Sequence, residues 1–409
     1  MYELVLKNFA HITSMAISHA RQYSSISLFS GIGGIDLGLH ECGFQPLFCA
    51  EIDVNAASTL HNWLSNNKIN CETASDIRQV NPEILIENLG ISPGELDILA
   101  GGPPCQSFSL IGKRHSLVDD RGLLLFEIVR FARVFLPKVI LIEQVKGLLS
   151  APCLNKHKGG VLANLIKELE KIGYQVNYKI LKASDYGVPQ LRERLFIVAS
   201  QYKKFIFPEP THCSMDKLEN TLLTYIYKPY VTVHDAIADL PEPVKKSELE
   251  IVPNHTDITP QRDRVRIHGV PEGECLARQL NLPSEQRQRL DPRKDTTKFR
   301  RLSWRQPSLT LRGGEVFYHP SEDRYLTPRE CMRLHGFPDE HILIGPIRGR
   351  SGSVKTLDQH RLVANSVPPI LSRILGKCIV EQFLADKSIT FDFYLNQSLF
   401  DVGCLLHHI

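Results

Sequence analysis

The chain lacks the features that would assign it to a metal-binding, secreted or membrane class. Its 10 cysteines are scattered, with no Cys-x-x-Cys pair and no cysteine–histidine spacing typical of zinc sites, so no metal is expected. In a chain of 409 residues this scatter favours reduced thiols over a secreted disulfide framework. No apolar run reaches the length of a membrane span. The net charge is only +3, so affinity for a polyanion would come from a local patch.

The order of predicted elements indicates an α/β fold. Strands are predicted at 27–30, 46–50, 96–100, 139–142, 175–181 and 194–199, and helices at 36–42, 123–135 and 161–172. Such alternation predicts a mostly parallel, Rossmann-like sheet with helices on both faces. We expect the last two strands to be antiparallel, because only a short connection joins them.

Prolines become frequent after residue 200 and the hydrophobic periodicity weakens, which predicts a smaller, irregular domain of short elements. The predicted boundaries are an N-terminal extension at 1–25, a first domain at 26–205 completed by 355–409, an irregular domain at 206–320, and a hinge at 321–354. In the hinge, Thr327 and Glu330 form a capping box that predicts a helix ending near Gly336.

Basic and aromatic residues alternate within 287–312, including Phe299 and Trp304. A solvated charged face is the usual explanation of such a run. Cations interleaved with aromatic side chains suit contact with nucleic-acid phosphates better, and we favour that interpretation.

Cys105 follows an apolar strand and two prolines in the run Gly101-Gly102-Pro103-Pro104-Cys105. A free cysteine is most often a buried core residue. Proline and glycine, however, fix a stiff turn at the end of a strand, where open α/β sheets carry their chemistry. The setting favours an accessible nucleophile.

A glycine turn after the first predicted strand predicts a cofactor site. The turn contains Gly31, Gly33 and Gly34, but position 36 is Asp36 where a dinucleotide-binding turn would have a third glycine, which disfavours NAD. Glu51 and Asp53 stand where an acid binds ribose hydroxyls, and Asp76-Ile77 offers a carboxylate and an apolar wall to an adenine. Each acid alone is as well explained as a solvated charge. A ribose and an adenine without a pyrophosphate describe S-adenosylmethionine.

Glu143 ends another apolar strand and should emerge on the same sheet edge as Cys105. Burial there would raise its pKa, which suits a group that shares a proton with a ring nitrogen. Gln190, Arg192 and Arg194 alternate and should point to one side, where two guanidiniums can hold a carboxylate or a carbonyl oxygen. The simpler alternatives are a strand-terminal surface acid and a surface salt-bridge ladder.

In combination these blocks resemble the C5-cytosine DNA methyltransferases of bacterial restriction-modification systems. The matching blocks, in chain order, are Leu28 to Gly38, Ala50 to Asp53, Gly101 to Ser109, Glu143 to Val145, Gln190 to Arg194, and Ala364 to Pro369.

The resemblance implies that the Cys105 thiolate attacks C6 of a flipped-out cytosine while Glu143 binds N3, and that Arg192 and Arg194 hold the base oxygen and Glu143. It also implies that S-adenosylmethionine is the methyl donor and duplex DNA the partner. We expect a cytoplasmic monomer, without a membrane partner, whose cognate restriction endonuclease acts separately. The residues implied to line the cofactor pocket are Phe29, Gly31, Gly33, Gly34, Glu51, Ile52, Asp76, Ile77, Pro103 and Asn365.

Two positions depart from the family pattern: Ser27 stands where aspartate is usual, and Gln144 where asparagine is usual. Glutamine keeps the amide but lengthens its reach, so we expect the loop that carries Cys105 to be anchored differently. Two alternatives stay open. One is a tRNA cytosine-5 methyltransferase of the same fold, although the long 206–320 region favours DNA. The other is a catalytically impaired DNA-binding relative, which the intact candidate residues disfavour.

Overall fold

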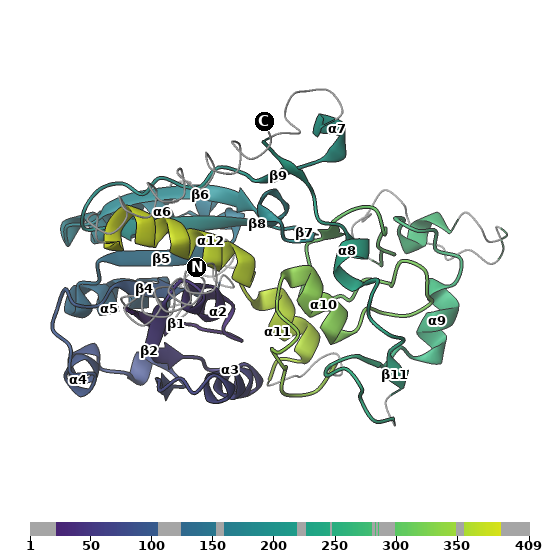
Figure 1. Cartoon of the computed structure of the whole chain (residues 1–409), viewed down its shortest axis with the longest axis horizontal. Coiled ribbons are helices and arrows are strands. Elements are labelled where there is room, and N and C mark those ends of the chain that lie inside the picture. The colour runs from purple at the N-terminus through teal and green to yellow at the C-terminus, as the bar shows by residue number, and fades with distance from the viewer. Residues whose placement is uncertain are drawn as a thin grey trace, which may run out of the picture.

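The computed structural model describes residues 22–104, 124–152, 159–218, 226–245, 248–279, 283, 285, 299–348 and 356–385. One lobe is built on a seven-stranded sheet with the strand order β3-β2-β1-β4-β5-β8-β6 (Figure 1). Its strands are β1 (Tyr23–Leu28), β2 (Phe44–Ala50), β3 (Glu72–Ala74), β4 (Ile98–Gly101), β5 (Val139–Gln144), β6 (Gln175–Lys182) and β8 (Glu193–Ser200).

The first five strands of this order run parallel, whereas β8 is antiparallel to both β5 and β6, as the short connection predicted. Strand order reverses between β1 and β4, so the chain leaves these two strands in opposite directions. In the register of the sheet, Leu28 pairs with Gly101 and Gly101 pairs with Ile142. The carboxyl ends of β1, β4 and β5 therefore meet at the edge where ligands bind in open α/β sheets.

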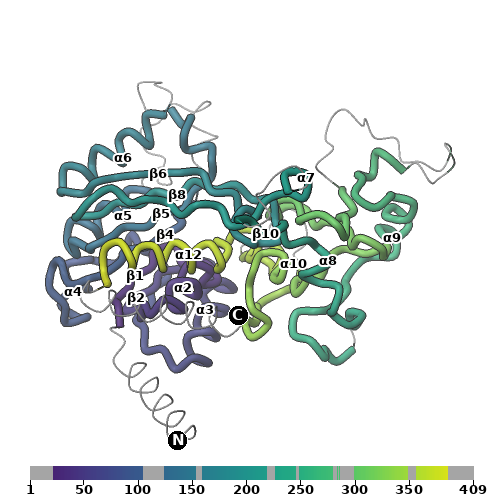
Figure 2. Tube along the Cα trace, turned by 45° about the horizontal axis from the view of Figure 1, so that its top comes forward, coloured from purple at the N-terminus to yellow at the C-terminus, as the bar shows by residue number. Residues whose placement is uncertain are grey.

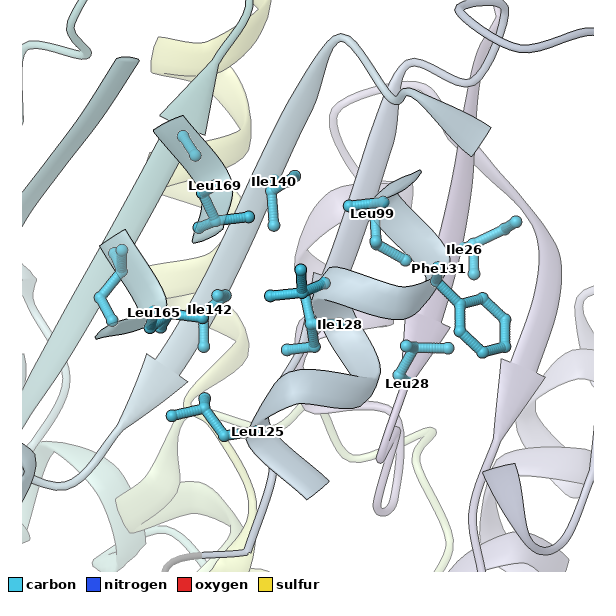
Figure 3. Close-up of a cluster of buried hydrophobic side chains, with 14 of the residues drawn as sticks. Ile26, Leu28, Leu99, Leu125, Ile128, Phe131, Ile140, Ile142, Leu165 and Leu169 are labelled. Atoms are coloured by element: carbon cyan, nitrogen blue, oxygen red, sulfur yellow. The ribbon is translucent and has the colours of Figure 1, made fainter. Parts of the chain in front are cut away.

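Helices cover both faces of the sheet. On one face, α4 (Pro82–Asn88), α5 (Leu124–Phe135) and α6 (Gly160–Lys171) pack on the side chains of β1, β4 and β5. Figure 3 shows this cluster, with Ile128 and Leu125 of α5 lying against the sheet. On the other face, α2 (Gly34–His40) and α12 (Pro369–Ile379) form a second core. The predicted α/β fold class is confirmed.

Two glycines let α2 pack closely against the segment that begins α12. A Cβ atom on Gly34 would lie 2.1 Å from the carbonyl oxygen of Val367, and one on Gly38 would lie 2.4 Å from the carbonyl oxygen of Pro369. Any other residue at these positions would separate the two backbones. This contact joins the C-terminal part of the chain to the first helix of the sheet lobe.

The second lobe consists of short elements, as predicted, and lies beside the carboxyl edge of the sheet (Figure 2). The elements of this lobe and of its connection to the sheet are β7 (Gln190–Leu191), β9 (His212–Cys213), α7 (Met215–Leu218), β10 (Lys228–Pro229), α8 (Val233–Ile237), β11 (Val244–Lys245), β12 (Thr256–Asp257), α9 (Gln261–Ile267), β13 (Ser308–Leu309), α10 (Pro328–His335) and α11 (Gln359–Asn365).

Helix α10 begins and ends as its sequence predicts. The Thr327 hydroxyl accepts from the backbone N–H of Glu330, the Glu330 carboxylate accepts from the backbone N–H of Thr327, and Gly336 ends the helix with a φ of 83°. Buried side chains of α10 and α11 form one core with those of α3 (Val54–Asn66). The two lobes are thus packed together through α3.

The first strand starts earlier than its prediction at 27–30. β1 begins at Tyr23, because Tyr23 pairs with Phe44 and the backbone N–H of Ser24 binds Asp97, so residues 23–25 lie in the sheet. β3 was not among the predicted strands, and Asp76 lies just beyond it, where it caps the short 3-10 helix Ile77–Gln79. Within the described ranges, no helix combines the length and apolarity needed to cross a membrane.

Candidate active site at the carboxyl edge of the sheet

Glu143 and Arg194 lie on adjacent antiparallel strands and form an ion pair. Glu143 pairs with Phe196 in the ladder of β5 and β8, which makes Arg194 its diagonal neighbour on the same face. Arg194 Nε lies 3.0 Å from Glu143 Oε1. Burial raises the pKa of the Glu143 carboxyl above its usual 4.5, although the charges of Arg194 and Arg192 oppose the rise. The Glu143 carboxyl is therefore oriented by Arg194, and its burial favours the protonated form more than in water.

Arg192 is among the most deeply buried charged residues of the described chain, with 1% of its surface exposed. Its Nη2 donates to the carbonyl oxygen of Ser366 at 3.0 Å. Its Nε and Nη1 atoms are buried and have no hydrogen-bond partner among the described residues. Burial, followed by the charge of Arg194, lowers the pKa of Arg192 to about 9, so the guanidinium stays charged at neutral pH. Buried donors of this kind are costly unless a ligand satisfies them.

Gln144 holds the segment that leads to Cys105. Its Nε2 donates to the carbonyl oxygen of Pro103 at 2.6 Å, and both residues are buried. Gln144 thus contacts the backbone two residues before Cys105, in the segment where a different anchoring was expected. Gly102 lies beside the acid, since a Cβ on it would stand 3.6 Å from Glu143 Oε2. Cys105 itself lies outside the described residues, so its predicted nucleophilic role stays a prediction.

The glycine turn and Glu51 form the opposite side of this edge. The backbone N–H of Gly31 donates to Glu51 Oε2 at 2.8 Å, and the backbone N–H of Asp53 donates to Oε1 at 2.8 Å. Burial raises the pKa of Glu51. Ile52 is 63% exposed, an unusual state for an isoleucine. A Cβ on Gly31 would meet no atom of the described residues within 4 Å.

Asp53 is occupied by structural contacts. It caps α3 by accepting from the backbone N–H groups of Asn55 and Ala56, and it also accepts from that of Leu357. Glu51 accepts two such bonds, one fewer than Asp53. The resemblance placed Glu51, and not Asp53, in the cofactor pocket, and that placement stays a prediction.

The remaining predicted cofactor residues differ from one another in burial and position. Phe29 is half-buried with a φ of 58°, and Gly33 precedes α2 with a φ of 85°. Asn365 is exposed at the end of α11, and its Oδ1 would lie 3.5 Å from a Cβ on Gly313. Their roles in the pocket stay predictions.

Asp76 and Ile77 are partly committed elsewhere. Arg78 forms an ion pair with Asp76 at 2.7 Å and, through that contact, lowers the pKa of the carboxyl. The Ile77 side chain is 3% exposed and belongs to the core below the sheet. An adenine at this position would therefore contact Asp76 in competition with Arg78, and would find little exposed surface of the Ile77 side chain.

Two buried residues beside the candidate site, His335 and Asp36, were not among the predicted site residues. His335, at the end of α10, contacts both Gln190 and the carbonyl oxygen of Ser366. Asp36 is buried beneath the glycine turn, where it accepts from the Ser27 hydroxyl at 3.3 Å and from Cys49 Sγ at 3.6 Å. Burial raises the pKa of Asp36 to about 6. The sequence signal for Asp36 was the serine at position 27, where the family usually has aspartate, because a second carboxylate nearby could take the place of the missing one.

A basic pocket adjoins the Glu143–Arg194 pair. It has a volume of about 430 Å³ and is lined by Val145, Lys146, Gly147, Lys182, Leu191, Glu193, Arg194 and Thr310. Residues 287–298 of the predicted basic run lie outside the described residues, whereas 299–312 are described. Among the described arginines of the run, Arg301 is committed to the fold, because its guanidinium is buried against Asp323 and the carbonyl oxygens of Val270 and His319. Arg305 and Arg312 are exposed, and phosphate contact by the run stays a prediction.

Comparisons with known proteins agree with this geometry. The family described as C-5 cytosine-specific DNA methylase matches residues 23–381. A type II methyltransferase of Neisseria gonorrhoeae, M.NgoFVII, is 33% identical and is covered over 86% of its length by 88% of this chain. Another, M.AquIA of Picosynechococcus, is 38% identical and matches 60% of this chain and 98% of its own.

Two solved structures share the fold. A prophage-encoded methyltransferase of E. coli has a TM-score of 0.62 and 22% identity, covering 88% of this chain and 99% of its own. The Entamoeba histolytica methyltransferase EhMeth has a TM-score of 0.55 and 16% identity, and the match covers 90% of this chain and 100% of its own. The match over 23–381, together with the carboxyl-edge site, shows that the chain belongs to the C-5 cytosine-specific DNA methylase family, as its sequence blocks predicted.

Proposed function

We propose that this enzyme transfers a methyl group from S-adenosylmethionine to C5 of a cytosine flipped out of a specific duplex DNA sequence. The observation that carries the proposal is the group of Glu143, Arg194 and Arg192, in which Arg192 keeps two buried N–H groups without a partner among the described residues. A cytosine presents a carbonyl oxygen beside its N3 edge. One planar base can therefore satisfy both the unpartnered nitrogens of Arg192 and the Glu143 carboxyl.

The residues at the glycine turn fit the proposed methyl donor. Glu51 retains lone pairs for ribose hydroxyls after accepting two backbone hydrogen bonds, and the exposed Ile52 offers an apolar face to an adenine ring. No described residue approaches within 4 Å of a Cβ on Gly31, which leaves room for a ligand against the backbone among these residues. When bound, S-adenosylmethionine supplies an electrophilic methyl group.

The chain's own residues would then act in sequence on the base. The Cys105 thiolate forms a bond to C6 while Glu143 hydrogen-bonds N3, which places electron density on C5. After C5 has taken the methyl group it loses its proton, and the C6–S bond breaks to release the thiolate. Arg192 and Arg194 hold the base oxygen and Glu143 throughout. The base must leave the duplex stack to reach these groups.

The basic pocket supports a duplex partner. Lys146 and Lys182 line it beside Arg194, and Lys146 is also exposed and paired with Glu193 at 3.0 Å. Cations at this position suit the phosphates that flank an extruded nucleotide. We place the recognition of the DNA sequence in the 206–320 region and assign the enzyme, acting as a monomer in the cytoplasm, to the protection of DNA from a separate restriction endonuclease.

The test is methylation of plasmid DNA with labelled S-adenosylmethionine, followed by bisulfite sequencing. We expect 5-methylcytosine at one sequence context from the wild type. Cys105→Ser should abolish transfer while retaining DNA and cofactor binding, because the thiolate is needed only for the covalent step. Cys213→Ser, which alters a buried thiol on β9, is the matched control and should remain active. Turnover by Cys105→Ser would overturn the mechanism, and methylation of tRNA but not plasmid would replace the proposed substrate.

A further inference from the structure

His335 is a fully buried histidine that bridges two parts of the candidate site. It ends α10, and none of its surface is exposed. Its Nδ1 lies 3.0 Å from Gln190 Nε2, and its Nε2 lies 3.0 Å from the carbonyl oxygen of Ser366. Gln190 precedes the two site arginines on the chain, whereas Ser366 lies between α11 and α12. The imidazole therefore links the sheet edge to the C-terminal segment.

The neighbours of Gln190 determine which nitrogen of His335 carries the proton. Gln190 Oε1 accepts from the backbone N–H of Leu311 at 3.2 Å, so its amide nitrogen must face His335. That nitrogen also donates to the carbonyl oxygen of Leu334. Because an amide N–H can only donate, His335 Nδ1 is the acceptor and Nε2 carries the hydrogen that is donated to Ser366. Burial, followed by the charge of Arg192, lowers the pKa of His335 well below its usual value, which agrees with a neutral ring.

The Ser366 carbonyl oxygen is shared between His335 and Arg192. Arg192 Nη2 donates to it at 3.0 Å, the same distance as the imidazole. This is the hydrogen bond that the described residues make to the Arg192 guanidinium, since its Nε and Nη1 are unpartnered. The direction of the guanidinium thus depends on where the Ser366 carbonyl is held.

We infer that His335 is a positioning residue for methyl transfer, whose neutral Nε2–H fixes the Ser366 carbonyl and thereby aims Arg192 at the base. This inference rests on the proposed function, because it assigns Arg192 to the carbonyl oxygen of the target cytosine. A neutral ring adds no second positive charge beside Arg192. A lysine or arginine at this position would repel the guanidinium that it should hold.

A role in core packing alone is the competing explanation, and two substitutions separate the two. His335→Leu keeps an apolar volume and removes both hydrogen bonds. His335→Gln can place an acceptor toward Gln190 and a donor toward Ser366, which preserves the polarity of the bridge. If His335 only fills space, Leu should be tolerated at least as well as Gln. If it positions Arg192, Gln should rescue turnover and Leu should not.

The experiment measures kcat and the KM for S-adenosylmethionine with duplex DNA as substrate. We expect His335→Leu to lower kcat by about 10-fold to about 100-fold, the range for a misplaced catalytic group, with the KM for S-adenosylmethionine within about 2-fold of wild type. His335→Gln should stay within about 5-fold in kcat. In an Arg192→Leu background, His335→Leu should cause little further loss, because both act through one contact.

His255→Leu is the matched control. His255 is also buried and bridges Thr327, the residue that caps the start of α10, to the carbonyl oxygen of Pro241. It should lower the melting temperature without lowering kcat, which separates weakening of α10 from displacement of Arg192. If His335→Leu does not fold, His335→Met and nitrogen-15 NMR of the His335 ring test the same point. The NMR spectrum should show the neutral Nε2–H form from pH 6 to 8.

Wild-type kcat in folded His335→Leu or His335→Met, additive losses with Arg192→Leu, or an Nδ1–H tautomer would each overturn the inference. A wild-type enzyme that leaves cytosine unmethylated in bisulfite sequencing would overturn the proposed function instead. The two failures are therefore distinguishable.

Discussion

Replacing Gln144 tests whether its contact with Pro103 sets the rate of methyl transfer. The Gln144 Nε2 donates to the Pro103 carbonyl oxygen at 2.6 Å, and Gln144 is 1% exposed. Gln144→Met keeps the length and approximate volume of the side chain but removes the donor, so a buried carbonyl loses this partner. Such a loss costs about 1–3 kcal/mol. Because the contact lies two residues before Cys105, we expect the cost to appear as misplacement of the nucleophile.

If the whole cost enters the barrier, about 1–3 kcal/mol corresponds to a rate about 5-fold to about 150-fold lower. The assay is single-turnover methylation of duplex DNA at saturating enzyme and S-adenosylmethionine, which excludes product release from the measured rate. Gln144→Asn is the more discriminating variant. Its side chain is about 1.5 Å shorter, which would leave the amide about 4 Å from the carbonyl. We expect Gln144→Asn to be slower than wild type, although asparagine is the usual residue at this position in the family.

Gln201→Met is the matched control for this prediction. Gln201 Nε2 also donates to a backbone carbonyl oxygen, that of Leu136 at 2.8 Å, but in an exposed position just after β8, away from the candidate site. Its loss should leave the single-turnover rate unchanged. The reasoning is refuted if folded Gln144→Met and Gln144→Asn both transfer the methyl group within about 2-fold of the wild-type rate, because no part of the 1–3 kcal/mol would then reach the transition state.

Two further predictions concern stability at the glycine turn. Burial raises the pKa of Asp36 from 3.8 to about 6, so the unfolded chain releases this proton first and the native state loses stability as the pH rises from about 4 to about 6. At about 1.4 kcal/mol per unit of pKa shift, Asp36→Asn should be more stable than wild type by up to about 3 kcal/mol at pH 8 and by little at pH 4. Urea unfolding at the two pH values measures this difference, and an equal difference at both would contradict the prediction. Gly34→Ala would place a Cβ 2.1 Å from the Val367 carbonyl oxygen and should destabilise by at least about 3 kcal/mol in urea unfolding. Gly31→Ala meets no atom within 4 Å and should cost only the strain of its φ of 58°, about 1–2 kcal/mol, so equal losses for the two variants would argue against close packing at Gly34.

Local patterns predicted much of the sheet and several of its neighbours. Strand alternation placed β5 and β8 within a few residues, and the capping box at Thr327 fixed both the start and the type of α10. These features depend on residues close together in the chain, which propensity and spacing describe. The ion pair of Glu143 with Arg194 also followed in outline, because both side chains were assigned to the same edge of the sheet.

The contacts that orient Arg192 were beyond sequence reasoning. Gln190 meets His335 across 145 residues of chain, and Arg192 meets Ser366 across 174. No periodicity connects such positions. The alternation rule placed Gln190, Arg192 and Arg194 on one side, but it could not reveal that a carbonyl from the C-terminal segment is the partner of Arg192. The partner of Asp76 was missed as well, although it is local: Arg78, two residues on, forms an ion pair with its carboxylate, and the predicted role of Asp76 in the cofactor pocket stays a prediction.

The two departures from the family pattern are each matched by a contact within this chain. At the first, the hydroxyl of Ser27 meets the Asp36 carboxylate at 3.3 Å, so a carboxylate still lies beneath the glycine turn although it comes from α2. At the second, the longer amide of Gln144 reaches Pro103 at 2.6 Å. A residue lost by drift would leave an unpaired group or a cavity. Both positions instead have a bonded partner, which argues that the turn and the Cys105 segment are built to work with serine and glutamine, and against an impaired enzyme.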